Sequence, residues 1–137
     1  MIMLDTTACI DYLNGNQKIK ELILGADELF STTTITIYEV GIGLEKTRRK
    51  ISEARYKKLY KDWSQFLSGI QIYSLNIKEA EKAAKICDQL EVQGEKVDDN
   101  DILIAGIMLS NGIHKIITRN ISHFERFKDL TIVSYGI

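Results

Sequence analysis

Short apolar segments alternate with helical segments along this chain, and this alternation constrains the fold more than any other feature. The first apolar segment, 2–4, leads at once into Asp5 and a helical pattern. Strands that alternate with helices need crossover connections, and right-handed crossovers build a parallel sheet with helices on both faces. We therefore predict an α/β fold with a central parallel sheet of four to five strands. The expected strands are 2–4, 29–33, 70–73, 115–117 and 131–133; the expected helices are 8–13, 19–26, one beginning near 34, 52–68, 77–92, 99–110 and a turn at 121–126.

Segment 32–38 is ambiguous between strand and helix. Its β-branched content favours a strand. However, Ile35, Tyr38 and Ile42 fit one face of a helix, and Thr34 is a candidate N-cap. We expect a strand to about residue 33 and a helix after it.

The chain carries no sign of a second domain or of a membrane segment. It has 137 residues, no proline, no repeat and no linker, so a single domain over 1–137 is expected. No apolar run approaches the ~20 residues needed to span a bilayer. The N-terminus lacks a basic region and reaches a charge at Asp5, unlike a signal peptide. The expected location is the cytoplasm.

Motifs for nucleotide binding and for covalent catalysis are absent from the sequence. There is no G-x-G-x-x-G after the first expected strand, no P-loop and no G-x-S-x-G. Cys9 and Cys87 lie far apart among apolar residues, so each is expected to be a small hydrophobic residue and not a zinc ligand. Carboxylates remain as the candidates for chemistry.

Three carboxylates stand in unusual surroundings. Asp5 directly follows the first strand, where an ordinary role as helix N-cap competes with a functional one. Glu39 is the only charged residue in 32–44, and a lone carboxylate there is costly to bury unless something positive compensates it. Asp101 lies on the apolar side of its helix. Asp98 and Asp99 begin the same helix, where acids favour the macrodipole, so a structural role is favoured for both.

The expected topology places such residues at one edge of the sheet. Ligands of open α/β sheets bind beyond the carboxyl ends of the strands, which points to Asp5 and to segments 32–39, 73–76 and 118–120. Carboxylates gathered there repel one another unless a cation neutralises them. Oxygen ligands select Mg²⁺ or Mn²⁺, and such an ion supports hydrolysis of phosphodiester bonds.

One segment is strongly basic although the net charge of the chain is only −1. Residues 46–61 contain eight lysines and arginines and a single glutamate. A solvated helix face and a surface for a polyanion or an acidic partner are both compatible with this pattern. The apolar stripe through Tyr56, Tyr60 and Trp63 is expected to face inward and the lysines outward.

Four blocks of the sequence resemble the PIN-domain endoribonucleases, specifically the VapC toxins of bacterial and archaeal toxin–antitoxin pairs. The blocks occur in the order found in that family and together span nearly the whole chain. They are "MLDTTACIDYL", "TTTITIYEVGIGLEK", "GEKVDDNDILIAGIMLSNG" and "IITRNISHFERFKDLTIV".

The resemblance implies a three-layer α/β/α PIN-like fold with an acidic cleft. It implies that Asp5, Glu39 and Asp101 hold Mg²⁺ or Mn²⁺, with Asp99 as a further source of charge. It also implies RNA as substrate, a homodimer, and inhibition by a VapB-like antitoxin whose tail enters the cleft. The residues expected to contact RNA or antitoxin are Thr6, Arg48, Arg49, Lys57, Lys58, Lys61 and Arg119.

The chain departs from the family after its fourth strand. Many relatives have a fourth acid where this chain has Asn120, and some with asparagine there have an acid three residues on, where this chain has His123. An amide can still orient an attacking water, so Asn120 is retained as a catalytic candidate and also as a helix cap. Occupancy of a second metal site is left open.

Two other classes of function compete with this interpretation. A phosphatase with an Asp nucleophile needs a second acid two residues after the first, and this chain has Thr7 there; a receiver domain needs an Asp after the third strand, where Tyr73-Ser74 stands. A non-catalytic module that binds only RNA or antitoxin is the other alternative. Retention of all three costly carboxylates favours the enzyme.

Overall fold

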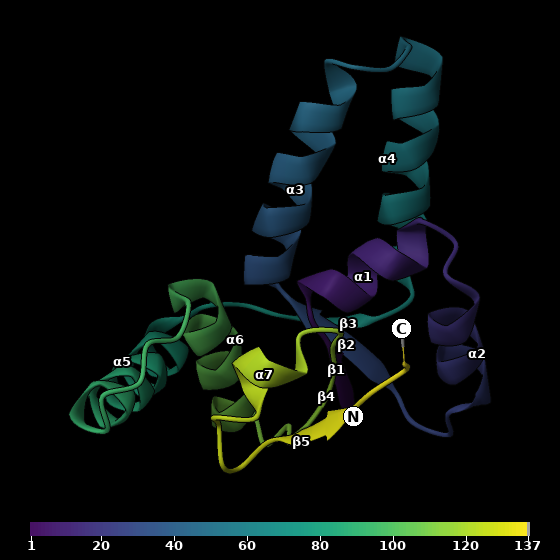
Figure 1. Cartoon of the computed structure of the whole chain (residues 1–137). Helices are drawn as coiled ribbons and strands as arrows, with labels where there is room; N and C mark the ends of the chain where they lie inside the picture. Colours follow the sequence, from purple (N-terminus) through teal and green to yellow (C-terminus); the bar gives the residue numbers. More distant parts are fainter. Residues whose placement is uncertain (137) are drawn as a thin grey trace.

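The computed structural model describes residues 1–136, and five parallel strands form its central sheet (Figure 1). The strand order is β3-β2-β1-β4-β5. Every residue of the central strand β1 is buried, and Met3 pairs with Ser31 on one side and Ile116 on the other. The predicted parallel sheet is confirmed. The strands are β1 (Ile2–Leu4), β2 (Phe30–Thr33), β3 (Gln71–Tyr73), β4 (Lys115–Ile117) and β5 (Thr131–Val133).

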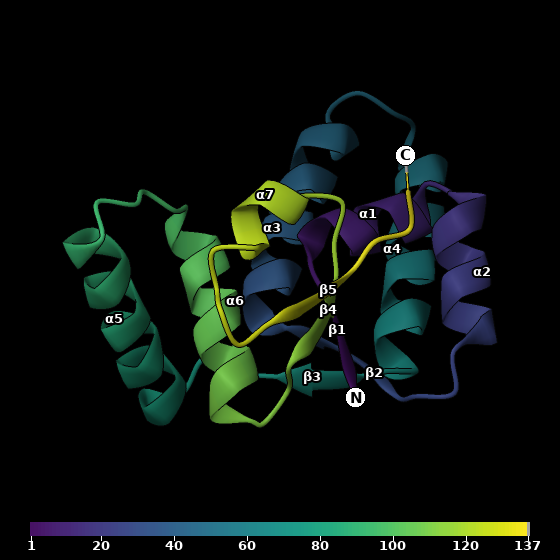
Figure 2. The same ribbon diagram turned by 60° about the horizontal axis from the view of Figure 1, so that its bottom comes forward.

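Helices cover both faces of the sheet, as Figure 2 shows. Helices α1 (Thr6–Leu13), α2 (Gln17–Gly25) and α4 (Glu53–Ser68) pack on the face toward which Ile2, Leu4 and Ile117 point. Helices α5 (Ile77–Val92) and α6 (Asp99–Ser110) cover the other face, with Met3 and Ile116. The short helix α7 (Ile121–Phe124) follows β4. The expected three-layer α/β/α fold is therefore confirmed. No helix within residues 1–136 is long and apolar enough to cross a membrane.

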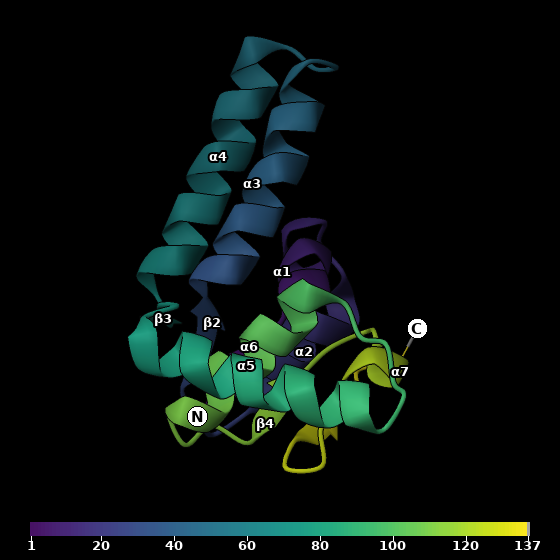
Figure 3. The ribbon, with the colours of Figure 1, turned by 90° about the vertical axis from the view of Figure 1, so that its left-hand side faces the viewer.

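Helix α3 (Thr34–Arg48) and helix α4 form an arm that projects beyond the sheet (Figure 3). The ambiguous segment divides as expected, since β2 ends at Thr33 and α3 begins at the next residue. The expected cap is wrong by one position. Thr33 is extended and its Oγ1 accepts the N–H of Thr36 at 3.1 Å, whereas Thr34 Oγ1 accepts the N–H of Leu75 at 3.3 Å.

The inward stripe expected on α4 is only partly correct. Trp63, near the sheet, is 3% exposed, but Tyr60 is 54% exposed. The outer part of α4 belongs to the arm and has no sheet beneath it, so it lacks a core to face. Arg48 of α3 covers the ring of Tyr56 there, with its guanidinium carbon 4.6 Å from the ring centroid.

Helices α5 and α6 approach each other closely at Gly106. A Cβ atom added to Gly106 would lie 2.7 Å from Cβ of Ala83 and 2.9 Å from its backbone nitrogen. Side chains do not tolerate such distances, because buried groups are already packed at the density of a crystal. Glycine at this position therefore sets the separation of the two helices.

Candidate metal centre

Three elements bring the three predicted carboxylates to the carboxyl edge of the sheet. Asp5 directly follows β1, Glu39 lies in the second turn of α3, which follows β2, and Asp101 lies in the first turn of α6. They are close enough to affect one another, because the charge of Asp101 raises the pKa of Asp5 and the charge of Glu39 raises the pKa of Asp101. The topology thus gathers these three residues as neighbours.

Asp5 is a buried carboxylate that also caps a helix. It is 3% exposed, and its Oδ1 accepts the N–H of Ala8 at 2.9 Å and the hydroxyl of Thr7 at 2.8 Å. Its Oδ2 accepts the hydroxyl of Thr118 at 2.5 Å. Burial raises the pKa of Asp5 to about 6 against the lowering effect of these three hydrogen bonds. The N-cap role considered from the sequence is therefore confirmed, and the raised pKa of this buried acid is compatible with the functional role, which stays a prediction.

Glu39 is half-buried and is held by two neutral donors. The hydroxyl of Thr6 lies 2.5 Å from its Oε1, and Nδ2 of Asn100 donates to its Oε2 at 3.3 Å. Thr6, which we expected to contact RNA or antitoxin, is thus already engaged by this acid. Asn100 joins α6 to α3 across the site.

Asp101 has a histidine as its neighbour. Nδ1 of His123 lies 2.9 Å from Oδ2 of Asp101, whose side chain is 15% exposed. Burial raises the pKa of Asp101, with the charges of Asp98 and Glu39 adding to the rise and His123 opposing it. Within residues 1–136 no hydrogen bond reaches Oδ1 of Asp101, so this oxygen is free to accept a ligand.

The oxygen atoms of these three acids suit a hard cation, although the three side chains do not converge on one point. Among residues 1–136, no three His, Cys, Asp or Glu side chains converge as a ready metal site. Each carboxylate is instead held by its own partners among the threonine, asparagine and histidine side chains described above. Two of the three acids nevertheless have a raised pKa, which is the condition that a bound cation relieves. The oxygen ligands fit Mg²⁺ or Mn²⁺.

The other predicted site residues lie around this edge with different partners. Asp99 is exposed. Partial burial is the main cause of the raised pKa of the Cys87 thiol on α5, and the charge of Asp99 is one of the smaller causes. Asn120 occupies the N-cap position of α7, but its side chain makes no capping hydrogen bond within the described residues, so the expected capping contact is wrong. Arg119 donates from Nη1 to Oδ1 of Asp11 at 3.2 Å, and Asp11 also accepts the hydroxyl of Tyr135.

Apart from Arg119, the basic residues predicted to contact RNA or antitoxin all belong to the arm or to the turn between its two helices. Lys57, Lys58 and Lys61 are exposed, as expected, and Lys58 pairs with Asp62 at 3.0 Å. Arg48 pairs with Glu53 at 3.7 Å, and Arg49 is exposed. The arm therefore keeps most of its positive charge available to a partner.

Sequence reasoning missed the residues that hold the acids. Thr7, Thr118, Asn100 and His123 each contact one of the three carboxylates. Thr118 lies in segment 118–120, which was expected at this edge without a role for the threonine, and His123 follows in the same block, "IITRNISHFERFKDLTIV". Asn100 had no signal beyond its position beside Asp101.

Comparison with known proteins finds a matching family model, a curated relative and solved structures with the same fold. Residues 2–130 match the family model described as PIN domain. A curated relative, Ribonuclease VapC2 of Rickettsia felis, is 26% identical over 136 residues, covering 97% of this chain and 96% of the relative. The DNA-bound VapBC structure from Salmonella typhimurium has a TM-score of 0.83 at 26% identity, covering 98% of both chains. The VapBC2 structure from Rickettsia felis bound to a promoter DNA fragment has a TM-score of 0.83 at 23% identity, covering 99% of this chain and 100% of that one, and supports the fold alone.

Proposed function

The chain belongs to the PIN domain family, and on this premise we propose that it is a Mg²⁺- or Mn²⁺-dependent endoribonuclease, the toxin of a type II toxin–antitoxin pair. The observation that carries the proposal is the gathering of Asp5, Glu39 and Asp101 from three separate elements at one edge of the sheet. The curated relative is named a ribonuclease, and the expected resemblance to VapC toxins is confirmed by the neighbours.

Asp5, Glu39 and Asp101 would hold the cation. When bound, the ion supplies a hydroxide nucleophile at neutral pH and stabilises negative charge on the phosphate. The protein's own part is orientation: Thr118 and Thr7 fix Asp5, Thr6 and Asn100 fix Glu39, and His123 fixes one oxygen of Asp101.

Two further residues complete the proposed centre. Asn120 follows β4 at the same edge and offers an amide to the attacking water in place of a fourth acid. Asp99 adds negative charge nearby. The number of bound ions, one or two, depends on how much of the negative charge of the missing fourth acid Asn120 and Asp99 replace.

The partners of the chain follow from the same proposal. Structural neighbours are VapBC and FitAB complexes, which supports a VapB-like antitoxin as the regulator of this chain. RNA and antitoxin would meet Arg48, Arg49, Lys57, Lys58 and Lys61 on the arm. Arg119 is held by Asp11 beside the acids and would present its remaining N–H groups to the RNA. A homodimer acting in the cytoplasm, with the whole chain as one PIN domain, completes the proposal.

Cleavage of total RNA by the purified chain tests the activity. It should require Mn²⁺ or Mg²⁺, stop with EDTA, and be lost in Asp101→Asn while the fold is kept. Asp98→Asn is the matched control, because Asp98 is the exposed N-cap of the same helix and accepts the N–H of Asn100 at 2.8 Å; its charge only adds to the raised pKa of Asp101, so its loss should leave most of the turnover. Turnover by Asp101→Asn equal to that of the unmodified chain, in limiting Mg²⁺, would contradict the role of Asp101.

A second candidate is a PIN module that binds RNA or antitoxin without cutting. The observation that favours it is that, among residues 1–136, no three His, Cys, Asp or Glu side chains are grouped closely enough to hold a metal ion. In that case RNA would bind with and without EDTA and no cleavage would appear at any metal concentration. An Asp nucleophile is disfavoured, because Thr7 stands where such enzymes need an acid and its hydroxyl is bonded to Asp5.

A further inference from the structure

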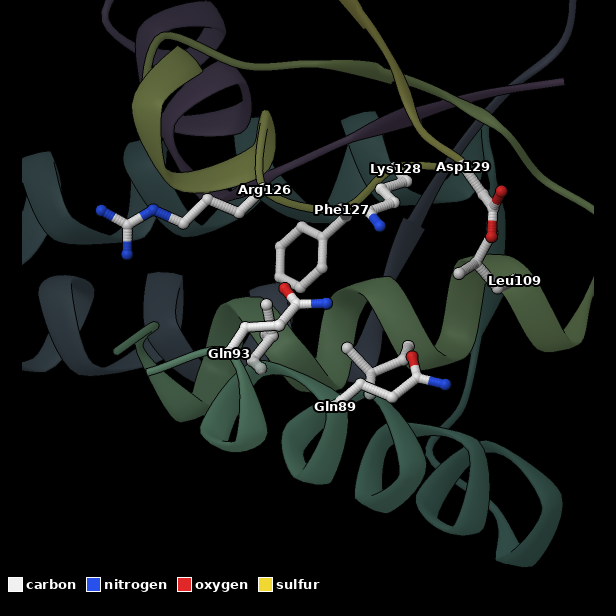
Figure 4. Close-up of a pocket in the computed structure, with 9 residues that line it drawn as sticks. Gln89, Gln93, Leu109, Arg126, Phe127, Lys128 and Asp129 are labelled. Carbon is white, nitrogen blue, oxygen red and sulfur yellow. The ribbon is translucent and has the colours of Figure 1, made fainter. Parts of the chain in front are cut away.

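A pocket of about 340 Å³ lies away from the carboxylates, between α5 and the loop that joins α7 to β5 (Figure 4). Its floor is apolar and includes Ile86, Leu90 and Phe127, which are between 5% and 8% exposed. Gln89 of α5 and Gln93, the C-cap of that helix, stand on one side, and Arg126, Lys128 and Asp129 of the loop on the other. An apolar floor with a few convergent polar groups is the usual form of a small-ligand site, for which volumes start at about 300 Å³.

Most of the polar groups around this pocket have no hydrogen-bond partner among the described residues. Within residues 1–136 the side chains of Gln89, Gln93 and Lys128 make no hydrogen bond or ion pair. Arg126 uses only Nη1, which donates to the backbone carbonyl of Lys96. This contact fixes the guanidinium and leaves its other N–H groups for a ligand.

The side-chain amides of the two glutamines can form hydrogen bonds with the flat polar edge of a ligand. Gln89 lies in the last turn of α5, and Gln93, four residues later, is its C-cap with a helical backbone conformation, so their side chains lie on the same face. Helical RNA-binding repeats recognise single bases in this way, with two or three side chains from one helix for each base. An amide that donates and accepts at once matches adenine, which presents a donor beside an acceptor. The two cations across the pocket exceed the single negative charge of Asp129 on that side, and this excess suits the phosphate next to such a base.

The pocket is also connected to the carboxylates through α7. His123, which contacts Asp101, is followed three residues later by Arg126, and Figure 4 shows Arg126 at the end of the pocket that lies beneath α7. The candidate metal centre and the pocket are therefore linked by one short segment, 123–126. Resting on the proposed ribonuclease function, we infer that this pocket takes one unstacked nucleobase of the RNA, with adenine preferred, and so contributes to the choice of RNA.

Binding of fluorescein-labelled eight-nucleotide oligoadenylate and oligouridylate, measured by anisotropy in EDTA, tests this inference without cleavage. The unmodified chain should prefer oligoadenylate by about fivefold or more. Gln89→Ala with Gln93→Ala should remove the preference and leave oligouridylate binding nearly unchanged. Gln71→Ala, an exposed glutamine on the edge strand β3, is the neutral control and should behave like the unmodified chain.

The cations should behave differently from the glutamines. Arg126→Ala with Lys128→Ala should weaken both RNAs equally and lower the log–log salt slope by roughly 1.4, about 0.7 for each phosphate contact on a single strand. Gln93→Glu, which keeps the size of the side chain, should reduce the adenine preference while the thermal unfolding temperature stays unchanged.

Three results would overturn the inference. They are an adenine preference that survives in the double glutamine variant, no preference in the unmodified chain, and a salt slope unaffected by loss of the two cations. These results are separate from the fate of the nuclease proposal, which is decided by cleavage in Mn²⁺. A chain that cuts RNA but shows no base preference keeps its proposed function and loses only this site.

Discussion

Asp5→Asn should stabilise the metal-free protein at neutral pH, although it removes a residue from the candidate metal centre. Burial raises the pKa of Asp5 from 3.8 to about 6. Each pKa unit corresponds to about 1.4 kcal/mol, so the ionised carboxylate costs the folded state about 3 kcal/mol at pH 7.5. Asparagine removes the charge but replaces the short bond from Thr118 with a weaker one, a loss of about 1 kcal/mol. The net gain is about 2 kcal/mol.

The pH dependence of this gain has a definite sign. Because the folded pKa is the higher one, Asp5 contributes stability below pH 3.8, and this contribution is lost as pH rises through about 6. The difference in unfolding free energy between Asp5→Asn and the unmodified chain should therefore grow between about pH 4 and 6 and stay constant above. Addition of Mn²⁺ should stabilise the unmodified chain more than the variant.

Urea unfolding in EDTA from pH 4 to 8 measures this difference directly. Asp98→Asn is a matched control, because Asp98 is also an N-cap but is exposed, and asparagine caps a helix about as well as aspartate. Its effect should be small at every pH and should vary with pH much less than that of Asp5→Asn, because Asp98 acts on the candidate metal centre only through its charge on Asp101. An Asp5→Asn variant that is destabilised equally at pH 4 and pH 7.5 would refute the reasoning and reduce Asp5 to a capping residue.

Three further changes give distinct outcomes. Asn120→Asp should tighten Mn²⁺ binding and lower metal-free stability by repulsion, and calorimetry that shows unchanged affinity would place Asn120 outside the metal site. Reversal of Lys57, Lys58 and Lys61 to glutamate should weaken RNA binding most at low salt, because exposed charges are screened beyond ~8 Å at physiological ionic strength. Cleavage of a dinucleotide-sized substrate by this variant should survive. If that variant loses antitoxin but not RNA, the arm binds protein only. Tyr135→Phe should cost about 1 kcal/mol of unfolding free energy, through loss of its hydrogen bond to the buried aspartate of α1, with no effect on Mn²⁺ affinity.

The elements of this fold were predictable because each has a strong local signal. Helix α5 and helix α6 begin and end where their apolar periodicity and flanking turns place them. The edge at which Asp5 and Glu39 meet follows from parallel topology, which fixes the side of the sheet without any knowledge of packing.

Contacts between distant residues had no such signal. His123 and Asp101 are 22 positions apart, and their contact depends on the direction in which α7 leaves β4. The pairing of Arg119 with Asp11 joins residues 108 positions apart. The exposure of Tyr60 has a similar cause, since periodicity shows which residues share a face but not whether the sheet extends beneath them.

The close approach at Gly106 has a consequence for the evolution of chains with this fold. Asp101 is carried by α6, and α6 is positioned on α5 by the absence of a single methyl group five residues away. A glycine-to-alanine change there would touch neither metal nor RNA, yet it would displace the helix that bears an acid. A chain with a larger residue at position 106 must also have a smaller or displaced residue at position 83, so the two positions are expected to change together. Tolerance to mutation in this protein is therefore set partly by a helix–helix contact whose own residues, Gly106 and Ala83, lie outside the candidate metal centre.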